Sequence, residues 1–303
     1  MRRKVIQLAG KTLVVSLPSK WAKKCGVKKG GEMDVQEEEK RLILTVDSKL
    51  KKSPKLLDAK GMEVVLGRVI GGMYKAGYDD IEITYDSPEQ YAIISKTLSK
   101  TCSGYEIIKH DRRTLKIKNI AELHEEDFDN IMRRLFLTLL SSADDALQYI
   151  SEGNLNGLEE IELRDVMINK YSDLCRRLLN LKSRETTTKT TTHYYICEEL
   201  EKVGDGYKDL ASFIINNKIK KVDKPTISLL AELNRLLRLF YELFYQFNFV
   251  KLEEFGVLSE KLKKQLSERL DSASAKELKL NYHLFRIFSL LFDMNGSLIT
   301  ANV

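Results

Sequence analysis

The 303-residue chain carries 50 Lys or Arg against 44 Asp or Glu and is 43% hydrophobic, a composition that excludes a largely disordered chain and allows two or three compact units. The four cysteines lie too far apart in sequence to indicate a disulfide framework or a zinc site: Cys25, Cys102, Cys175 and Cys197. We find neither a signal peptide nor a stretch of about 18 uncharged apolar residues, so we expect a soluble, cytoplasmic protein.

Positive charge is concentrated at the N-terminus. The first 31 residues contain nine Lys or Arg and no Asp or Glu, and residues 1–52 hold 14 basic and 6 acidic side chains, leaving 36 basic and 38 acidic for the rest of the chain. Such a cluster favours a polyanion, most simply DNA, although basic residues on a small domain also serve solubility. The candidate phosphate contacts are Arg2, Arg3, Lys4, Lys11, Lys20, Lys23 and Lys24.

The same segment has the pattern of a small β-rich domain. Val5 to Val15 alternates as two short strands around a Gly turn, and Pro18 then opens a short helix that stops at Gly26. Residues 33–36 and 42–46 predict a hairpin across a charged turn. About 47 residues of this kind bury little surface alone, so we expect a dimer.

The next 70 or so residues, after a linker over 49–55, predict a small α/β unit over 56–120. We expect helices over 62–76 and 88–98, a strand over 81–85, and a hairpin over 105–117. Gly67, Gly71 and Gly72 lie inside the first helical pattern and do not follow a strand, so they form no nucleotide fingerprint. We assign this unit no chemistry.

From residue 121 to 303 every long segment has a helical period. Gly153 breaks the first helix, and a Thr-rich stretch over 186–192 is expected to interrupt the pattern, because β-branched polar residues are poor in a helix interior. Two sets of three helices suggest an internal duplication. The expected helices span about 128–150, 158–178, 200–214, 225–249, 258–270 and 275–298.

One expected helix carries a row of carboxylates. Spacings of three, four and four place Glu198, Glu201, Asp205 and Asp209 along one face. Carboxylate oxygens suit Mg, Ca, Mn or ferric iron, with Glu162 and Asp165 of the preceding helix as further donors. The alternative is a solvated face that Lys202 and Lys208 partly neutralise.

The sequence offers little for catalysis. The four histidines stand in four different predicted elements, and no Ser or Cys has the context of a nucleophile elbow: His110, His124, His193 and His283. We therefore name no catalytic residue and expect no enzyme. Metal-dependent hydrolysis would need a base or nucleophile that the pattern does not reveal.

Leu17-Pro-Ser-Lys-Trp-Ala-Lys-Lys-Cys-Gly-Val-Lys-Lys-Gly-Gly31, followed by an alternating strand, resembles the signature of the SpoVT/AbrB family. The resemblance covers residues 1 to about 47, predicts a domain over 1–50, and implies a swapped-hairpin β-barrel dimer that binds DNA. The resemblance also places the basic residues of this segment near the phosphates of the bound DNA. Antitoxins share this module, so the fold alone does not fix its role.

The helical half resembles the PhoU family of phosphate-uptake regulators, most clearly over Tyr194-Tyr-Ile-Cys-Glu-Glu-Leu-Glu-Lys-Val-Gly-Asp-Gly-Tyr-Lys-Asp209. The resemblance implies three-helix bundles and a multinuclear site for a divalent metal or iron near Glu201 and Asp205. In the preceding helix the pattern falls on Asp165, with Asn169 in place of the second carboxylate. The last helix retains only Asp293.

Together these features predict a multidomain α+β protein, similar to archaeal phosphate-uptake regulators with an AbrB-type domain. We expect a dimeric transcriptional regulator of phosphate uptake whose helical region senses a ligand or binds a partner. The alternative is an adaptor that regulates a phosphate ABC transporter or a signalling kinase through protein contacts, with the barrel serving dimerisation alone. The operator, the effector and the sign of regulation do not follow from sequence.

Overall fold

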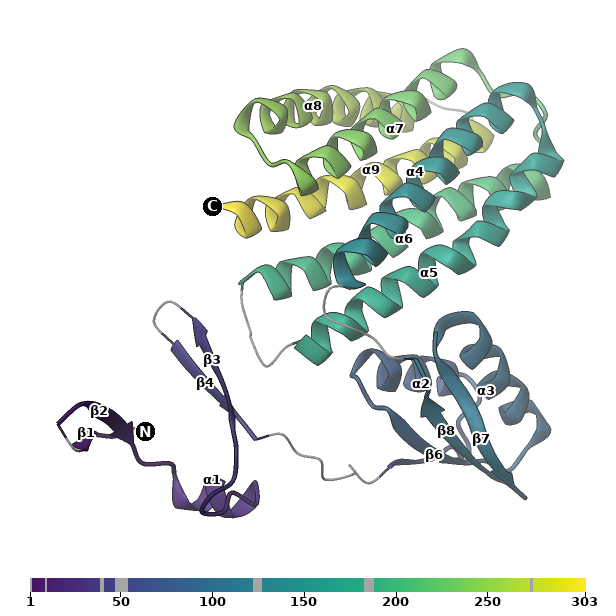
Figure 1. The fold of residues 1–303 in the computed structure, drawn as a ribbon. Helices are drawn as coiled ribbons and strands as arrows, with labels where there is room; N and C mark the ends of the chain where they lie inside the picture. The colour runs from purple at the N-terminus through teal and green to yellow at the C-terminus, as the bar shows by residue number, and fades with distance from the viewer. Residues whose placement is uncertain are drawn as a thin grey trace. The chain divides into compact units, whose positions relative to one another are not determined.

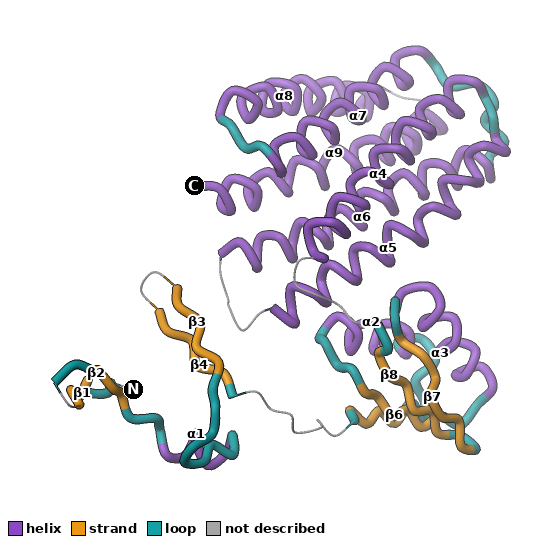
Figure 2. Tube along the Cα trace, viewed as in Figure 1, coloured by secondary structure: helices purple, strands orange, loops and turns teal. Residues whose placement is uncertain are grey.

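The computed structural model describes residues 2–8, 10–38, 41–46, 54–121, 127–182, 188–272 and 275–303 (Figure 1). It contains two compact units, Met1–Ser53 and Pro54–Val303. The first unit is built from short strands and one short helix, and the second is mostly helical (Figure 2). The expected linker lies largely outside the described residues, which resume at Pro54.

The N-terminal unit consists of two hairpins and a helix. Strands β1 (Val5–Leu8) and β2 (Thr12–Val15) pair antiparallel, as do β3 (Asp34–Glu38) and β4 (Arg41–Thr45), while α1 (Ser19–Lys24) lies between the two hairpins in sequence. These elements confirm the predicted order. They form two separate two-stranded sheets in the single chain, so the swapped-hairpin barrel is not seen here.

Helix α1 begins and ends where the sequence predicts. Pro18 precedes its first residue, and Gly26 follows its last turn with a φ of +67°, a conformation that glycine adopts at little cost. The Val27 N–H donates to the Ala22 carbonyl and the Gly26 N–H to the Lys23 carbonyl. This is the Schellman arrangement, which satisfies carbonyls that the helix end would leave free.

The α/β region contains one four-stranded sheet in the order β5-β6-β8-β7. The strands β5 (Lys55–Asp58) and β6 (Asp80–Thr84) are parallel, while β8 (Thr114–Asn119) runs antiparallel to β6 and to β7 (Tyr105–Asp111). The crossover helices α2 (Leu66–Lys75) and α3 (Pro88–Thr101) contact each other, as right-handed crossovers advancing in one direction along the sheet require.

Two details of this region differ from the prediction. Strand β5 was not predicted: its first residue, Lys55, was assigned to the linker, and residues 56–58 were assigned no element because they carry little alternation. Helix α2 begins at Leu66, four residues later than expected. Helix α3 starts as predicted at Pro88, where the Ser87 hydroxyl accepts from the Gln90 N–H and so caps the helix.

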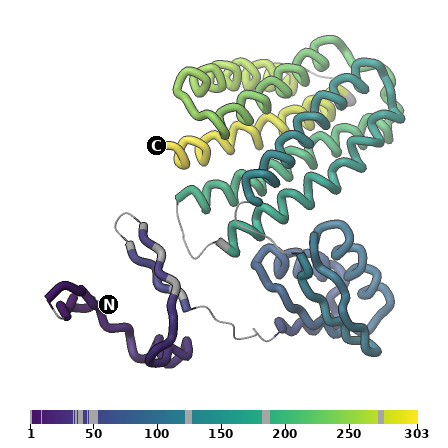
Figure 3. The backbone as a smooth tube through the Cα atoms, viewed as in Figure 1, coloured from purple at the N-terminus to yellow at the C-terminus, as the bar shows by residue number. Residues whose placement is uncertain are grey.

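Six long helices make up the rest of the second unit: α4 (Asp127–Glu152), α5 (Leu155–Lys182), α6 (Thr188–Asn216), α7 (Lys224–Tyr245), α8 (Phe249–Ser272) and α9 (Ala275–Asn302). Helices α4, α5 and α6 contact one another, as do α7, α8 and α9 (Figure 3). The two sets join through contacts of α6 with α9 and of α4 with α7. One continuous apolar core runs through both sets.

Two expected helix boundaries are wrong. Thr188 to Thr192 belong to α6, where the Thr191 and Thr192 hydroxyls donate to the Thr188 carbonyl, a bond that threonine commonly makes within a helix. Phe249 begins α8, whereas the pattern had extended the preceding helix to it and begun the next at residue 258. Residues 183–187, which include the first two threonines of the stretch, lie outside the described residues.

Helix α9 is an exception to the expected lack of long apolar segments. Within the described chain, Glu277–Asn302 is long and apolar enough to cross a bilayer, with a mean hydropathy of 1.2. Its buried side chains recur at helical spacing, from Leu284 and Ile287 to Leu291, Met294 and Leu298, and they join the core shared with α6, α7 and α8. One face of α9 therefore lies in the core, and 39% of the apolar segment is buried.

Arg177 of α5 ties the bundle to the α/β region. Its side chain is 0% exposed, and its guanidinium donates to the Tyr74 carbonyl at 2.6 Å and to the Tyr78 carbonyl at 3.1 Å. It also pairs with Asp79, and Asn180 donates to the Lys75 carbonyl at 2.8 Å. A cation and an amide of α5 thus satisfy carbonyls at the negative end of α2.

Two histidines of the bundle lie half-buried against aromatic rings. The His193 ring stacks on Phe128, with centroids 5.7 Å apart, and lies 5.2 Å from Phe244, while His283 lies 5.3 Å from Phe213. Burial lowers the pKa of both imidazoles; nearby Lys189 adds to this for His193 and Asp129 opposes it, while Asp209 opposes it for His283. Both rings therefore pack as neutral groups.

We expect the bundle to lose stability on mild acidification. Below the ordinary histidine pKa near 6.5, the unfolded chain binds protons that the folded chain does not, so stability falls from that pH toward the lowered pKa values. Thermal midpoints measured between about pH 7 and about pH 5 should fall less for His193→Phe than for the wild type. His110→Gln, at an exposed histidine, is the control, and a slope unchanged by His193→Phe would contradict the assignment.

Candidate functional site

The seven basic residues proposed from sequence as phosphate contacts are all exposed. They lie on the N-terminal segment, in the turn between β1 and β2, and along α1. Within the described part of the chain, none of them has an acidic partner. Their charges are therefore available to a polyanion.

Many apolar side chains of the same unit are exposed too. No described side chain of this unit is buried, and Val5 and Leu13 are 65% and 70% exposed. An isolated two-stranded hairpin is marginally stable in water. The hairpins therefore need a further surface that the described residues of this unit do not provide. The exposed apolar residues are Val5, Ile6, Leu8, Leu13, Val15, Val35 and Leu42.

Among the predicted metal-binding carboxylates, Asp165 and Asp205 meet a lysine, whereas Glu162 accepts from the Ser212 hydroxyl. The Lys208 Nζ lies 2.8 Å from Asp165 Oδ2 and also pairs with Asp205, while the Asn169 amide donates to Asp165 at 3.1 Å. Hydrogen bonds to these two carboxylates raise the pKa of Lys208 despite its partial burial, and burial raises the pKa of Asp165. The ammonium supplies the positive charge between Asp165 and Asp205.

The rest of the predicted carboxylate row is divided among separate cations. Arg176 of α5 lies 3.4 Å from Glu201 and 3.8 Å from Glu198, and Asp209 pairs with Arg286 of α9. Burial raises the pKa of Glu201, an effect that Arg176 opposes. The row is neutralised by basic side chains, which agrees with the alternative stated in the sequence analysis. Two of these side chains, Arg176 and Arg286, come from other helices.

The described residues do not assemble a metal centre. Within them, no three side chains of metal-ligating type meet, and Asp293 is exposed on α9. Two oxygens remain as acceptors, since Asp165 Oδ1 and Asn169 Oδ1 are buried without a partner. As folded, these residues fit an ammonium better than a metal ion.

Sequence reasoning missed Arg176 and Arg177. Both are buried in α5, where they organise the carboxylates and the joint to α2. A signal was present, because two consecutive arginines stand between Cys175 and Leu178, which the periodicity assigns to the core. Buried arginines imply partners on neighbouring elements.

Comparison with known proteins identifies the N-terminal segment. Residues 6–55 match the family described as "Antidote-toxin recognition MazE, bacterial antitoxin". The chain carries an AbrB-type domain at its N-terminus. No curated protein and no solved structure matches the chain.

The AbrB-type domain accounts for the properties of the first unit. Domains of this type bind DNA and form dimers, in agreement with the exposed basic residues and with the exposed apolar hairpins. A DNA-binding regulator and an antitoxin are both consistent with it. The match ends at residue 55, so it says nothing of the α/β region or the bundle.

Proposed function

We propose that the protein is a dimeric DNA-binding transcriptional regulator. The observation that carries the proposal is the AbrB-type match over a segment whose basic side chains are exposed and lack acidic partners in the described chain. Phosphate contacts from such residues supply most of the affinity for duplex DNA. We assign those contacts to Arg2, Arg3, Lys4, Lys11, Lys20, Lys23 and Lys24.

The dimer forms through the two hairpins. A second copy covers the apolar residues of β1 and β2 and completes a barrel of exchanged hairpins, which removes sheet edges and buries side chains such as Val5 and Leu13. The two basic surfaces are then related by two-fold symmetry. A site with two symmetric half-sites follows from that arrangement.

The proposed process is phosphate uptake. Support comes from the resemblance of 194–209 to the PhoU signature and from six helices that group in two sets of three. The bundle is then the region that senses a ligand or binds a partner, such as a phosphate ABC transporter or a signalling protein. This role places the protein in the cytoplasm.

A second candidate is an antitoxin. The matched family is described by its recognition of a toxin, and such a chain would neutralise a partner protein as well as bind DNA. Co-expression with a growth-arresting toxin encoded beside it would separate the two: rescue of growth identifies an antitoxin. Absence of both DNA binding and rescue would favour the adaptor.

Metal binding is proposed in a restricted form: a divalent cation binds Asp165 and Asp205 when the Lys208 ammonium is absent. Lys208→Met removes a positive charge from between these carboxylates, so it should tighten Mn²⁺ binding at least about tenfold, measured by calorimetry. Lys202→Met, at a lysine that pairs with Glu198 and Glu199, is the control. Equal, weak binding by both variants would remove the metal from the account.

The proposed function is tested by selecting duplexes from a random DNA library with the full-length protein. We expect enrichment of a sequence with two-fold symmetry, because the proposed dimer presents the same surface twice. Enriched sequences would then be compared with the promoters of phosphate-transport genes. A library that remains random after selection would overturn sequence-specific regulation.

A further inference from the structure

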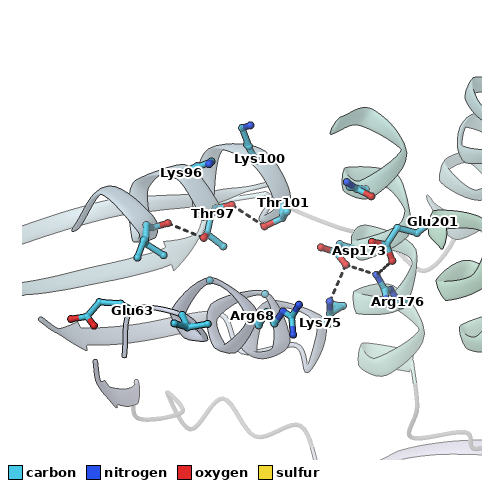
Figure 4. Close-up of a pocket in the computed structure, with 15 residues that line it drawn as sticks. Glu63, Arg68, Lys75, Lys96, Thr97, Lys100, Thr101, Asp173, Arg176 and Glu201 are labelled. Carbon is cyan, nitrogen blue, oxygen red and sulfur yellow. Dashed lines mark hydrogen bonds and ion pairs between the residues drawn. The ribbon is translucent and has the colours of Figure 1, made fainter. Parts of the chain in front are cut away.

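A cleft lies within the Pro54–Val303 unit, between the α/β region and the bundle. It has a volume of about 680 Å³, and its lining comes from α2 and α3 on one side and from α5 and α6 on the other (Figure 4). Pockets for small organic ligands fall in the range of roughly 300 to 1,000 Å³. The cleft is therefore large enough for a nucleotide-sized molecule.

Glycines of α2 create the space. A Cβ at Gly67 would lie 2.9 Å from the Thr97 hydroxyl, so this glycine permits the close approach of α3. Gly71 is buried, yet nothing lies within 4 Å of a Cβ built there, so a side chain at this position would extend into the cleft. Each glycine inside a helix costs about 1 kcal/mol relative to alanine, a cost typical of positions that admit another group.

The lining carries more positive than negative charge. Arg68 of α2 and Lys96 and Lys100 of α3 are exposed and have no acidic partner in the described chain. Glu63 is the acidic residue on the α/β side, where Figure 4 shows it apart from the two lysines. Three cations from two helices thus line the outer part of the cleft without neutralising contacts.

The inner end of the cleft is an ordered network. The Asp173 carboxylate lies 3.2 Å from Lys75 Nζ and 2.7 Å from Arg176 Nη2, and Arg176 reaches Glu201 at 3.4 Å (Figure 4). Arg176 is 5% exposed, and its Nε is buried without a partner. Asn169 adds a buried carbonyl oxygen without a partner.

We propose that this cleft binds a small organic phosphate. The phosphate groups contact Arg68, Lys96 and Lys100, because guanidinium and ammonium groups are the usual protein ligands of phosphate. The organic part lies over Gly71 and Ile93, where the wall lacks charge. The inference stands independently of whether the AbrB-type domain binds DNA.

A ligand in this position would contact both regions of the unit. Helix α2 is held to α5 by Arg177 and Asn180, and the cleft opens beside that joint. A molecule that binds α2, α3 and α5 together stabilises their present arrangement relative to any other. The cleft is thus suited to an effector whose binding stabilises one arrangement of the α/β region and the bundle.

The inference is tested by calorimetric titration of the full-length protein with ATP, inorganic phosphate and citrate. We expect ATP to bind with one molecule per chain, and more tightly than inorganic phosphate, which lacks the organic part, or citrate, which lacks phosphate. Citrate binding as tight as ATP binding would overturn the phosphate assignment. Inorganic phosphate binding as tight as ATP binding would overturn the contact with Gly71 and Ile93.

Matched variants locate the site. Gly71→Leu fills the cleft and should weaken ATP binding at least tenfold, whereas Gly72→Leu, on the exposed side of the same helix, should leave it unchanged. Lys96→Glu with Lys100→Glu should also lose at least tenfold without altering the fold, because both residues are exposed. Absence of ATP binding by the wild type, or binding that these variants leave intact, would overturn the proposal.

A further control separates the cleft from the basic N-terminal segment, which also attracts polyanions. Lys11→Glu with Lys23→Glu should retain ATP binding, because neither residue lines the cleft. Loss of ATP binding in this variant alone would place the nucleotide on the N-terminal segment and overturn the cleft assignment. DNA binding can fail in the same protein without affecting this result.

Discussion

Arg177→Met should destabilise the Pro54–Val303 unit by about 3 kcal/mol, because the charged guanidinium donates two hydrogen bonds to backbone carbonyls, each worth about 1.5 kcal/mol or more. The side chain is fully buried, and its loss removes one of the two donors to each of the Tyr74 and Tyr78 carbonyls, which keep the Gly77 N–H and the Tyr105 hydroxyl. It also removes the guanidinium from the Tyr74 ring, whose centroid lies 4.9 Å away. Differential scanning calorimetry of the full-length protein measures the effect.

A matched substitution on the surface controls for the loss of an arginine. Arg238 pairs with Asp144 at 2.7 Å, but both side chains are exposed, so Arg238→Met should cost at most about 1 kcal/mol. Arg177→Lys keeps a charge but loses the two-pronged geometry, and it should fall between the two. If Arg177→Met destabilised no more than Arg238→Met, the joint between α5 and α2 would not depend on Arg177.

Lys11→Glu with Lys23→Glu should weaken DNA binding by about four orders of magnitude at about 0.1 M salt. Each phosphate contact contributes about 0.9 to the slope of log affinity against log salt, and the proposed dimer carries each lysine twice. Losing four contacts therefore lowers the slope by about 3.6 and the affinity by about tenfold for each contact. Both side chains are exposed, which leaves the fold intact. Fluorescence anisotropy with a labelled duplex measures the affinity and the slope.

The control must carry the same change in net charge at a distance from the AbrB-type domain. Lys118 and Lys221 are exposed residues of the second unit, and neither has an acidic partner in the described chain. Lys118→Glu with Lys221→Glu should leave the salt slope as it is in the wild type. If the two double variants bound DNA alike, Lys11 and Lys23 would be removed from the interface.

The sequence predicts local structure well where one signal dominates. The hairpins follow from alternating side chains around a turn at Gly10, and α1 follows from Pro18 at its start and Gly26 at its end. Strand β5 was not predicted because four residues are too few to show an alternating pattern. The start of α6 was not predicted because β-branched threonines have low helix propensity, although the structure accommodates them with hydroxyl bonds to the Thr188 carbonyl.

The sites are harder to predict because their residues come from distant elements. Spacing places Glu201 and Asp205 on one face of α6, but it cannot show that Arg176 of α5 and Arg286 of α9 reach that face. The cleft likewise combines four helices. The only sequence feature that indicated the cleft was the group of glycines within α2. The structure explains Gly67 by the close approach of α3 and Gly71 by the open space beside it.

The central claim, that the AbrB-type domain makes this protein a sequence-specific DNA-binding regulator, is tested most directly by an affinity series in salt. Binding of the full-length protein to the enriched duplex and to its scrambled version would be measured from about 50 to about 200 mM salt. We predict that affinity falls for both duplexes while the preference for the enriched duplex persists. Equal binding that salt abolishes for both, or no binding at all, would contradict the claim.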